Sequence, residues 1–165
     1  MKKYEFTGET KEIRLLFRTA TLHRIRATVA FGIVEVGDLG GWIEKEENLS
    51  HEGKAWVWGN AEVWGNAKVC GDAKVWGNAK VFSASHVLVI GAIGSRNDFT
   101  TFYRDKDNEI TVKCGCFLGK IDRFLEKVTQ THGDSKYALV YRAAVEVAKL
   151  QIDLSGEAPK DADEE

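Results

Sequence analysis

Small and β-branched residues return every six positions between residues 55 and 81. Alanine stands at positions 55, 61, 67, 73 and 79, and valine stands two residues after each alanine. A Gly-Asn or Gly-Asp pair follows at positions 59–60, 65–66, 71–72 and 77–78. Neither the 3.6-residue turn of an α-helix nor the two-residue alternation of a strand produces this period. The pattern predicts short strands with alanine and valine facing inward, joined by corners at which glycine takes a positive φ.

This repeat resembles the bacterial transferase hexapeptide family over about residues 49–93. The resemblance implies a left-handed parallel β-helix with three hexapeptides per coil, so that residues eighteen apart stack. Stacking of this kind places Trp58 over Trp76 and Trp64 over Phe82, all pointing outward. Outward aromatic side chains in a contiguous patch usually mark an interface, and members of this family usually form trimers. We therefore expect a homotrimer, or alternatively a ligand-stacking platform, that uses Trp56, Trp58, Trp64, Trp76 and Phe82.

The segments on either side of the repeat follow other patterns. Residues 3–6, 12–17 and 21–31 predict two or three strands, with turns at Gly37-Asp38 and Gly40-Gly41. Residues 99–104 and 109–114 predict a hairpin, and two amphipathic helices follow, one after Gly119 and one after Ser135. The predicted fold is mainly β. It has an N-terminal β cap (1–38), a left-handed β-helix (39–93), a hairpin plus two helices (94–152) and a disordered acidic tail (153–165).

The order of these elements carries a second resemblance. It runs from cap strands through GDLGGWIEKEENL, the hexapeptides and GSRN to a hairpin ending in CGCF and a helix ending in His-Gly-Asp. This order resembles that of small, mostly uncharacterised β-helix proteins of phages and prophages. The resemblance implies a phage setting rather than a particular reaction.

Charge and cysteine content bear on the partners of the protein and on its cellular compartment. The net charge of −2 gives no general signal for nucleic acid or for a membrane surface. Polar residues follow Met1, and no apolar run approaches the length of a membrane span, which predicts neither a signal peptide nor a membrane anchor. Three cysteines fit a reducing compartment. We expect the protein in the cytoplasm of a bacterial host cell.

Candidate ligand-binding residues lie mostly outside the repeat. The turn Ser95-Arg96-Asn97 offers backbone N–H groups, a hydroxyl and a guanidinium to an anion. His132 ends a predicted helix, where the dipole favours positive charge. The other candidates are the strand arginines, which present rigid forks to phosphate or carboxylate, and the outward histidine of the repeat: Arg24, Arg26 and His86.

Catalysis is the less favoured interpretation. Acyltransferases of the hexapeptide family use a histidine base, but here only His86 projects outward from the regular repeats, without an acidic companion. Cys114 and Cys116 lack two further ligands, so we predict no metal and no cofactor. The sequence thus favours a non-catalytic, oligomeric phage-type protein that sequesters an anionic, nucleotide-like signalling molecule in counter-defence. The alternatives are an acyltransferase and a protein–protein inhibitor or assembly scaffold.

Overall fold

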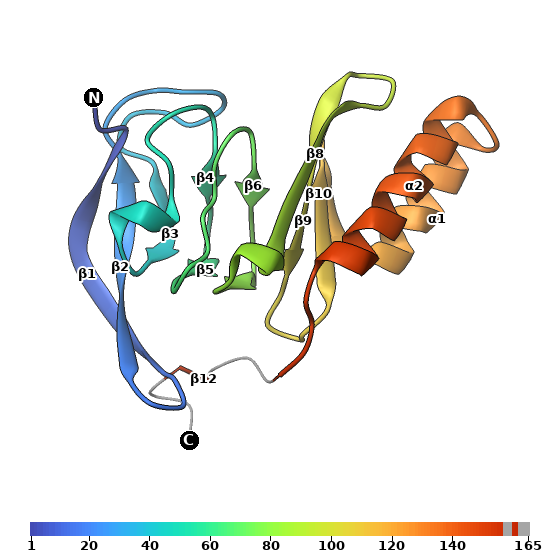
Figure 1. The fold of residues 1–165 in the computed structure, drawn as a ribbon. Helices are drawn as coiled ribbons and strands as arrows, with labels where there is room; N and C mark the ends of the chain where they lie inside the picture. The colour runs from blue at the N-terminus through green and yellow to red at the C-terminus, as the bar shows by residue number, and fades with distance from the viewer. Residues whose placement is uncertain (157–159, 162–165) are drawn as a thin grey trace.

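The computed structural model describes residues 1–156 and 160–161, which form three sheets and two α-helices (Figure 1). Two short 3₁₀ helices, Glu46–Asn48 and Ala84–His86, lie beside the regular elements. The strands and helices are β1 (Tyr4–Arg14), β2 (Thr19–Ala27), β3 (Leu39–Ile43), β4 (Trp56–Val57), β5 (Glu62–Val63), β6 (Lys74–Val75), β7 (Lys80–Val81), β8 (Val87–Ile93), β9 (Asp98–Arg104), β10 (Ile110–Cys114), β11 (Phe117–Lys120), α1 (Ile121–His132), α2 (Lys136–Gln151) and β12 (Lys160–Asp161).

The N-terminal segment is a long antiparallel hairpin followed by a third strand. β1 pairs with β2 through a bulge between Phe6 and Thr10, and β2 pairs with β3. The two or three strands expected here are present. The predicted turn at Gly40-Gly41 is wrong, because both glycines lie inside β3. A Cβ at Gly40 would sit 2.6 Å from the Ile25 side chain, so the pair is needed for close packing rather than for chain reversal.

The repeat builds two-residue strands with parallel pairing. β4 pairs with β6 and β5 pairs with β7, and in both pairs the partners are eighteen residues apart, as for Trp56 with Lys74. The four corner glycines have φ values from +59° to +66°. The local period therefore produced the strands and corners that the sequence predicts.

The predicted fold class, a short left-handed parallel β-helix, is wrong. The parallel strands of the repeat are divided between two sheets, and the larger sheet, β12-β1-β2-β3-β5-β7, continues through antiparallel strands. β8, expected within the last coil, instead pairs antiparallel with β9 in a separate four-stranded sheet. Long antiparallel ladders offer many more paired residues than two-residue rungs, so they determine the architecture at both ends of the repeat.

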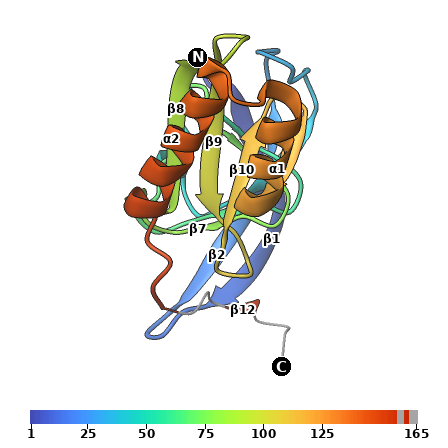
Figure 2. The same cartoon turned by 90° about the vertical axis from the view of Figure 1, so that its right-hand side faces the viewer.

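The C-terminal part is an antiparallel sheet, β11-β10-β9-β8, covered by both helices on one face (Figure 2). The hairpin expected from residues 99–104 and 109–114 is β9 with β10. The predicted apolar stripe of α1 is buried at Ile121, Phe124 and Val128. Gly133, with a φ of +56°, ends α1, and α2 begins immediately after Ser135.

Three apolar clusters stabilise the described part of the chain. The largest joins the alanines and valines of the repeat to Tyr4 and Ile25 of the N-terminal strands and to Tyr103 of β9. A second lies between the four-stranded sheet and the helices, and a third surrounds Trp42 and Trp64. The largest cluster includes residues on both sides of the predicted domain boundaries at 38/39 and 93/94. Those boundaries stay predictions.

The segment after α2 is held by hydrogen bonds. The Asp153 N–H donates to the Ser85 carbonyl at 3.0 Å, and the Arg104 guanidinium donates to the carbonyls of Ser155 and Gly156 at 3.3 and 2.9 Å. Residues 153–156, predicted to begin the disordered acidic tail, are therefore held in place, because the buried Arg104 of β9 donates to their backbone and the Ser85 carbonyl accepts from it. Lys160–Asp161 pairs with Ile13 and Arg14 of β1. The remainder of the tail, 157–159 and 162–165, lies outside the described residues.

Candidate binding site

Two hollows flank the turn that joins β8 to β9. The first, the helix cleft, has a volume of about 210 Å³ and lies between this turn, the β10–β11 turn and the two helices. The second, the repeat hollow, has a volume of about 360 Å³ and lies between the same turn, the repeat and the loop at residues 32–34. Asp98 lines both, so a short segment of chain separates two potential sites.

Two close approaches give the helix cleft its shape. A Cβ added at Gly94, where φ is +78°, would overlap the Tyr141 hydroxyl, so glycine allows α2 to pack against the β8–β9 turn. Gly115, with a φ of +55°, occupies the first position of the two-residue turn between β10 and β11. This turn presents Cys116 at the edge of the cleft, opposite Arg96 on the β8–β9 turn.

Aromatic rings form the inner wall of the helix cleft. Phe124 lies with its ring centroid 5.4 Å from that of Phe117 and 5.7 Å from that of Tyr141. The His132 ring stacks on Tyr141 at 5.7 Å. Burial, and then the neighbouring Cys114, raise the pKa of Tyr141 to about 12. The phenol is therefore neutral and able to donate a hydrogen bond at physiological pH.

Positive charge predominates at the mouth of the helix cleft. Arg96 and Lys127 line it, and within residues 1–156 neither side chain has a hydrogen bond or an ion pair to another residue. The single carboxylate, Asp98, accepts a hydrogen bond of 2.7 Å from the Phe99 backbone N–H. An unpaired guanidinium beside an apolar aromatic wall is suited to a ligand that combines a flat ring with an anionic group.

The structure brings together three of the residues singled out from the sequence: Ser95, Arg96 and His132 all line the helix cleft. Asn97, which has a φ of +47°, turns to the other side and lines the repeat hollow. The strand arginines lie elsewhere, on β2 (Figure 1). Arg24 lies over the Trp42 ring at 5.3 Å, and Arg26 forms a 2.6 Å ion pair with Glu5, so both have partners within the larger sheet.

His86 does not project outward, and that prediction is wrong. The chain leaves the six-residue period at Ser83 and forms a 3₁₀ turn, which buries the His86 ring. Its Nδ1 accepts a hydrogen bond from the Phe82 N–H at 3.2 Å, and its Nε2 lies 3.2 Å from Nη1 of Arg104. Burial, and then the charge of Arg104, lower the pKa of His86 to about 4. A neutral, enclosed imidazole of this kind stabilises the fold rather than binding an anion.

We expect the stability of the protein to fall as the pH is lowered from 6.5 toward 4. The unfolded chain takes up a proton on His86 near the ordinary pKa of 6.5, whereas the folded chain does so only near 4. The stability is therefore fully present above pH 6.5 and declines below it, by on the order of 1–2 kcal/mol. Urea unfolding at pH 7 and at pH 4.8 measures this change.

The matched variants for this experiment are His86→Asn and His23→Gln. The first should flatten the dependence on pH and the second should leave it unchanged. Glu46 and Asp107, whose pKa values are lowered by hydrogen bonds from Lys2 and Lys120, weaken the fold only below their ordinary values of 4.5 and 3.8. An unaltered slope in His86→Asn would show that another group carries the effect.

The aromatic columns expected at eighteen-residue spacing are present. Trp58 stacks on Trp76 at 4.4 Å, and Trp64 stacks on Phe82 at 4.7 Å. However, the Trp64 ring is covered by Trp42 and other residues of the third cluster, and Trp56 is fully buried. These two rings have almost no surface to offer a partner. The interface prediction therefore concerns the half-buried Trp58, Trp76 and Phe82, for which it stays a prediction.

Sequence reasoning missed several residues of the helix cleft. Phe124, Val128 and Tyr141 belong to the apolar stripes of two amphipathic helices, and such positions indicate a core, to which all three also belong. Lys127 carried no signal beyond that of an exposed helix position. The available indication was the sequence Cys114-Gly-Cys116-Phe117 just before α1, because the tight turn there lines the cleft together with the C-terminal half of α1.

Comparisons with known proteins add no family to this description. No protein-family model matches the chain, and no curated protein matches it. The described residues contain no helix that is long and apolar enough to cross a membrane. The resemblances to hexapeptide transferases and to small phage β-helix proteins therefore stay predictions.

Proposed function

We propose that this chain is a non-catalytic binding protein that sequesters a small, anionic, nucleotide-like molecule in the helix cleft. The observation that carries the proposal is the convergence of Ser95, Arg96 and His132 on one cleft with an aromatic inner wall. The phage-type order of elements supports a counter-defence role in a bacterial host, and the three free thiols suit its cytoplasm.

The size of the helix cleft indicates how such a ligand is held. Pockets that enclose a whole drug-sized ligand measure roughly 300–1,000 Å³. The helix cleft, at about 210 Å³, is smaller and accommodates one ring system rather than an entire nucleotide. The base therefore packs against the half-buried Phe117, and the phosphate remains at the mouth, where Arg96 and Lys127 offer positive charge.

The acyltransferase alternative receives no support from the arrangement of His86. A general base must reach the proton that it abstracts, and both nitrogens of this buried ring already face groups of the same chain. The partner-binding alternative has one observation in its favour. The outer side of α2 exposes Leu139, Val147 and Leu150, the last at 89%, which favours contact with another protein or with a second copy. Native mass spectrometry separates these two outcomes.

Calorimetric titration with cyclic nucleotides, mononucleotides and ADP-ribose tests the proposal. Arg96→Gln should weaken binding by at least about tenfold, because a hydrogen bond to a charged group contributes about 1.5–3 kcal/mol. Arg123→Gln on α1 removes the same charge from an exposed position outside the cleft and should leave the affinity unchanged. The proposal fails if the unsubstituted protein releases no heat with any of these ligands at high micromolar concentration.

A further inference from the structure

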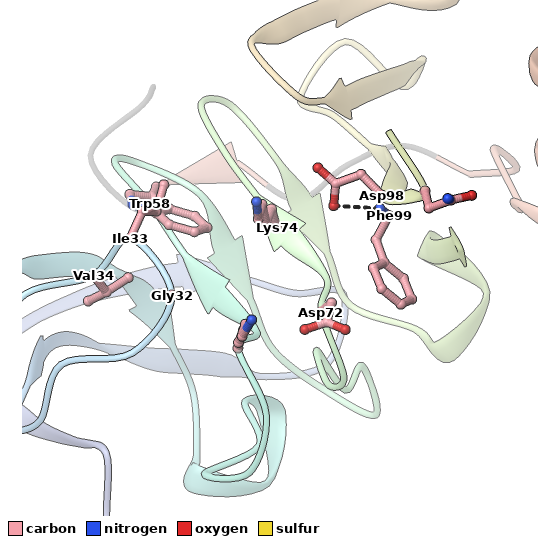
Figure 3. Close-up of a pocket in the computed structure, with 10 residues that line it drawn as sticks. Gly32, Ile33, Val34, Trp58, Asp72, Lys74, Asp98 and Phe99 are labelled. Carbon is pink, nitrogen blue, oxygen red and sulfur yellow. Dashed lines mark hydrogen bonds between the residues drawn. The ribbon is translucent and has the colours of Figure 1, made fainter. Parts of the chain in front are cut away.

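The repeat hollow is a second, differently built depression. Figure 3 shows Trp58 and Ile33 on one side, Asp98 and Phe99 on the other, and Lys74 between them. Its remaining lining comes from the loop at residues 32–34, from the repeat corner and from the β8–β9 turn: Gly32, Val34, Lys54, Asp72 and Asn97. With a volume of about 360 Å³, it lies within the range of roughly 300–1,000 Å³ that is typical of small-molecule sites.

Trp58 provides a rigid apolar surface in this hollow. Its indole stacks on Trp76 with an interplanar angle of only 8°, and the Lys113 ammonium lies 5.0 Å from the Trp76 ring centre on the same column. Trp58 is half-buried and lines the hollow, so part of the supported ring is open to a ligand. An indole held in place in this way binds a flat apolar face without losing further conformational freedom.

The polar groups around Trp58 balance one another. Lys54 and Lys74 are donors, Asp72 and Asp98 are acceptors, and the Asn97 amide can act as either. Two positive and two negative charges give no net preference for an anion, in contrast to the helix cleft. A phosphate placed here would face two carboxylates. The lining is instead suited to a neutral molecule with several hydroxyl groups, each of which both donates and accepts.

Asp72 is the feature that distinguishes this corner from the others. The corners of the repeat carry Asn60, Asn66 and Asn78 at the equivalent positions, and only this one carries a carboxylate. Gly71 has a φ of +66°, close to the values of the other corner glycines, so the turn itself does not require aspartate. Within residues 1–156, the Asp72 side chain has no hydrogen bond or ion pair. Its carboxylate is therefore available to a ligand.

We propose that the repeat hollow binds a neutral pyranose sugar ring. The apolar C–H face of the ring packs on Trp58, and the ring hydroxyls donate to Asp72 and accept from Lys74. The site is separate from the helix cleft and does not depend on the function proposed for that cleft. It makes the chain a two-site protein, with a sugar on one side of the β8–β9 turn and an anion on the other.

Titration with methyl α-glucopyranoside and N-acetylglucosamine, followed by two-dimensional amide and indole NMR, tests the sugar site. We expect saturable shifts with millimolar affinity that are centred on the Trp58 indole and on the amides of residues 71–74 and 97–99. Asp72→Asn should weaken binding by about tenfold, because an amide replaces a charged acceptor. This variant recreates the corner found at the other three repeats, so it should fold normally.

Lys74→Gln and Lys68→Gln form a matched pair at the same position of successive repeats. Lys74 lines the hollow, whereas Lys68 is exposed outside it. The first should weaken sugar binding several-fold and the second should leave it unchanged. Absence of saturable shifts at 50 mM sugar, equal effects of the two lysine variants, or binding of zwitterionic phenylalanine in place of sugars would each overturn the assignment. Arg96→Gln changes only the helix cleft and leaves the repeat hollow intact. A failure of nucleotide binding can therefore be distinguished from a failure of sugar binding.

Discussion

Replacement of Trp56 by alanine is expected to lower the free energy of unfolding by about 4 kcal/mol, within the range for truncating a buried tryptophan. The Trp56 side chain is fully buried. Its ring meets Tyr4 at 6.1 Å and Phe31 at 5.3 Å, both edge to face. Truncation therefore leaves a cavity where the repeat meets the N-terminal strands, because neighbouring backbone pairing limits how far that region can collapse.

Urea denaturation at two protein concentrations, with Trp58→Ala as the comparison, checks this expectation. Trp58 is half-buried, and its ring stacks on that of Trp76. Its truncation should therefore lower the free energy of unfolding by less, about 1–2 kcal/mol. If Trp56 instead lies at a subunit interface, the variant dissociates an oligomer and its stability depends on protein concentration. Equal losses for the two variants would also refute a core position for Trp56.

Substitution of Gly41 by alanine is expected to destabilise the protein by about 3 kcal/mol, at the upper end for inserting a methyl group into a packed core. A Cβ at Gly41 would lie 2.5 Å from the Ala61 carbonyl oxygen and 2.7 Å from Cγ1 of Val57. That carbonyl already accepts the Trp42 N–H at 2.9 Å, where β3 pairs with β5. The new methyl group therefore separates the two strands on which the largest sheet depends.

Gly71→Ala provides the control, measured by thermal and urea unfolding. No atom lies within 4 Å of a Cβ built at Gly71, so its cost comes only from a φ of +66°. That strain amounts to about 1 kcal/mol. If Gly41→Ala costs no more than Gly71→Ala, close strand packing at β3 is not what requires the glycine.

The local geometry of the repeat was predictable because it depends on near neighbours. Glycine at each corner follows from the six-residue period, whereas stacking at an eighteen-residue spacing is what the resemblance to the hexapeptide family implies, and Trp58 does stack on Trp76. The architecture around the repeat was not predictable in this way. The architecture depends on which strands pack against the ends of the repeat. No pattern in the sequence indicates that β1 and β2 cover Trp64.

The structure brings some of the candidate residues together and places others elsewhere, for related reasons. Ser95 and Arg96 were identified because a polar turn after a regular segment is conspicuous, and His132 because it ends a helix. His86 was misplaced because its position was extrapolated from the six-residue period beyond Ser83. There the Ser83 hydroxyl accepts a hydrogen bond from the Ser85 N–H, and a different turn begins. Periodicity predicts positions only as far as the chain keeps it.

The attachment of the segment after α2 has a consequence for synthesis on the ribosome. Arg104 donates to the carbonyls of residues 155 and 156, and the strand at 160–161 pairs with β1, which precedes it by more than a hundred residues. The outer edge of β1 near Ile13 and the guanidinium of Arg104 therefore gain these backbone partners only after α2 has been translated. A chain that stopped before residue 153 would leave this strand edge and these guanidinium donors without their backbone partners, and it would be more prone to aggregate than one that continues to residue 161.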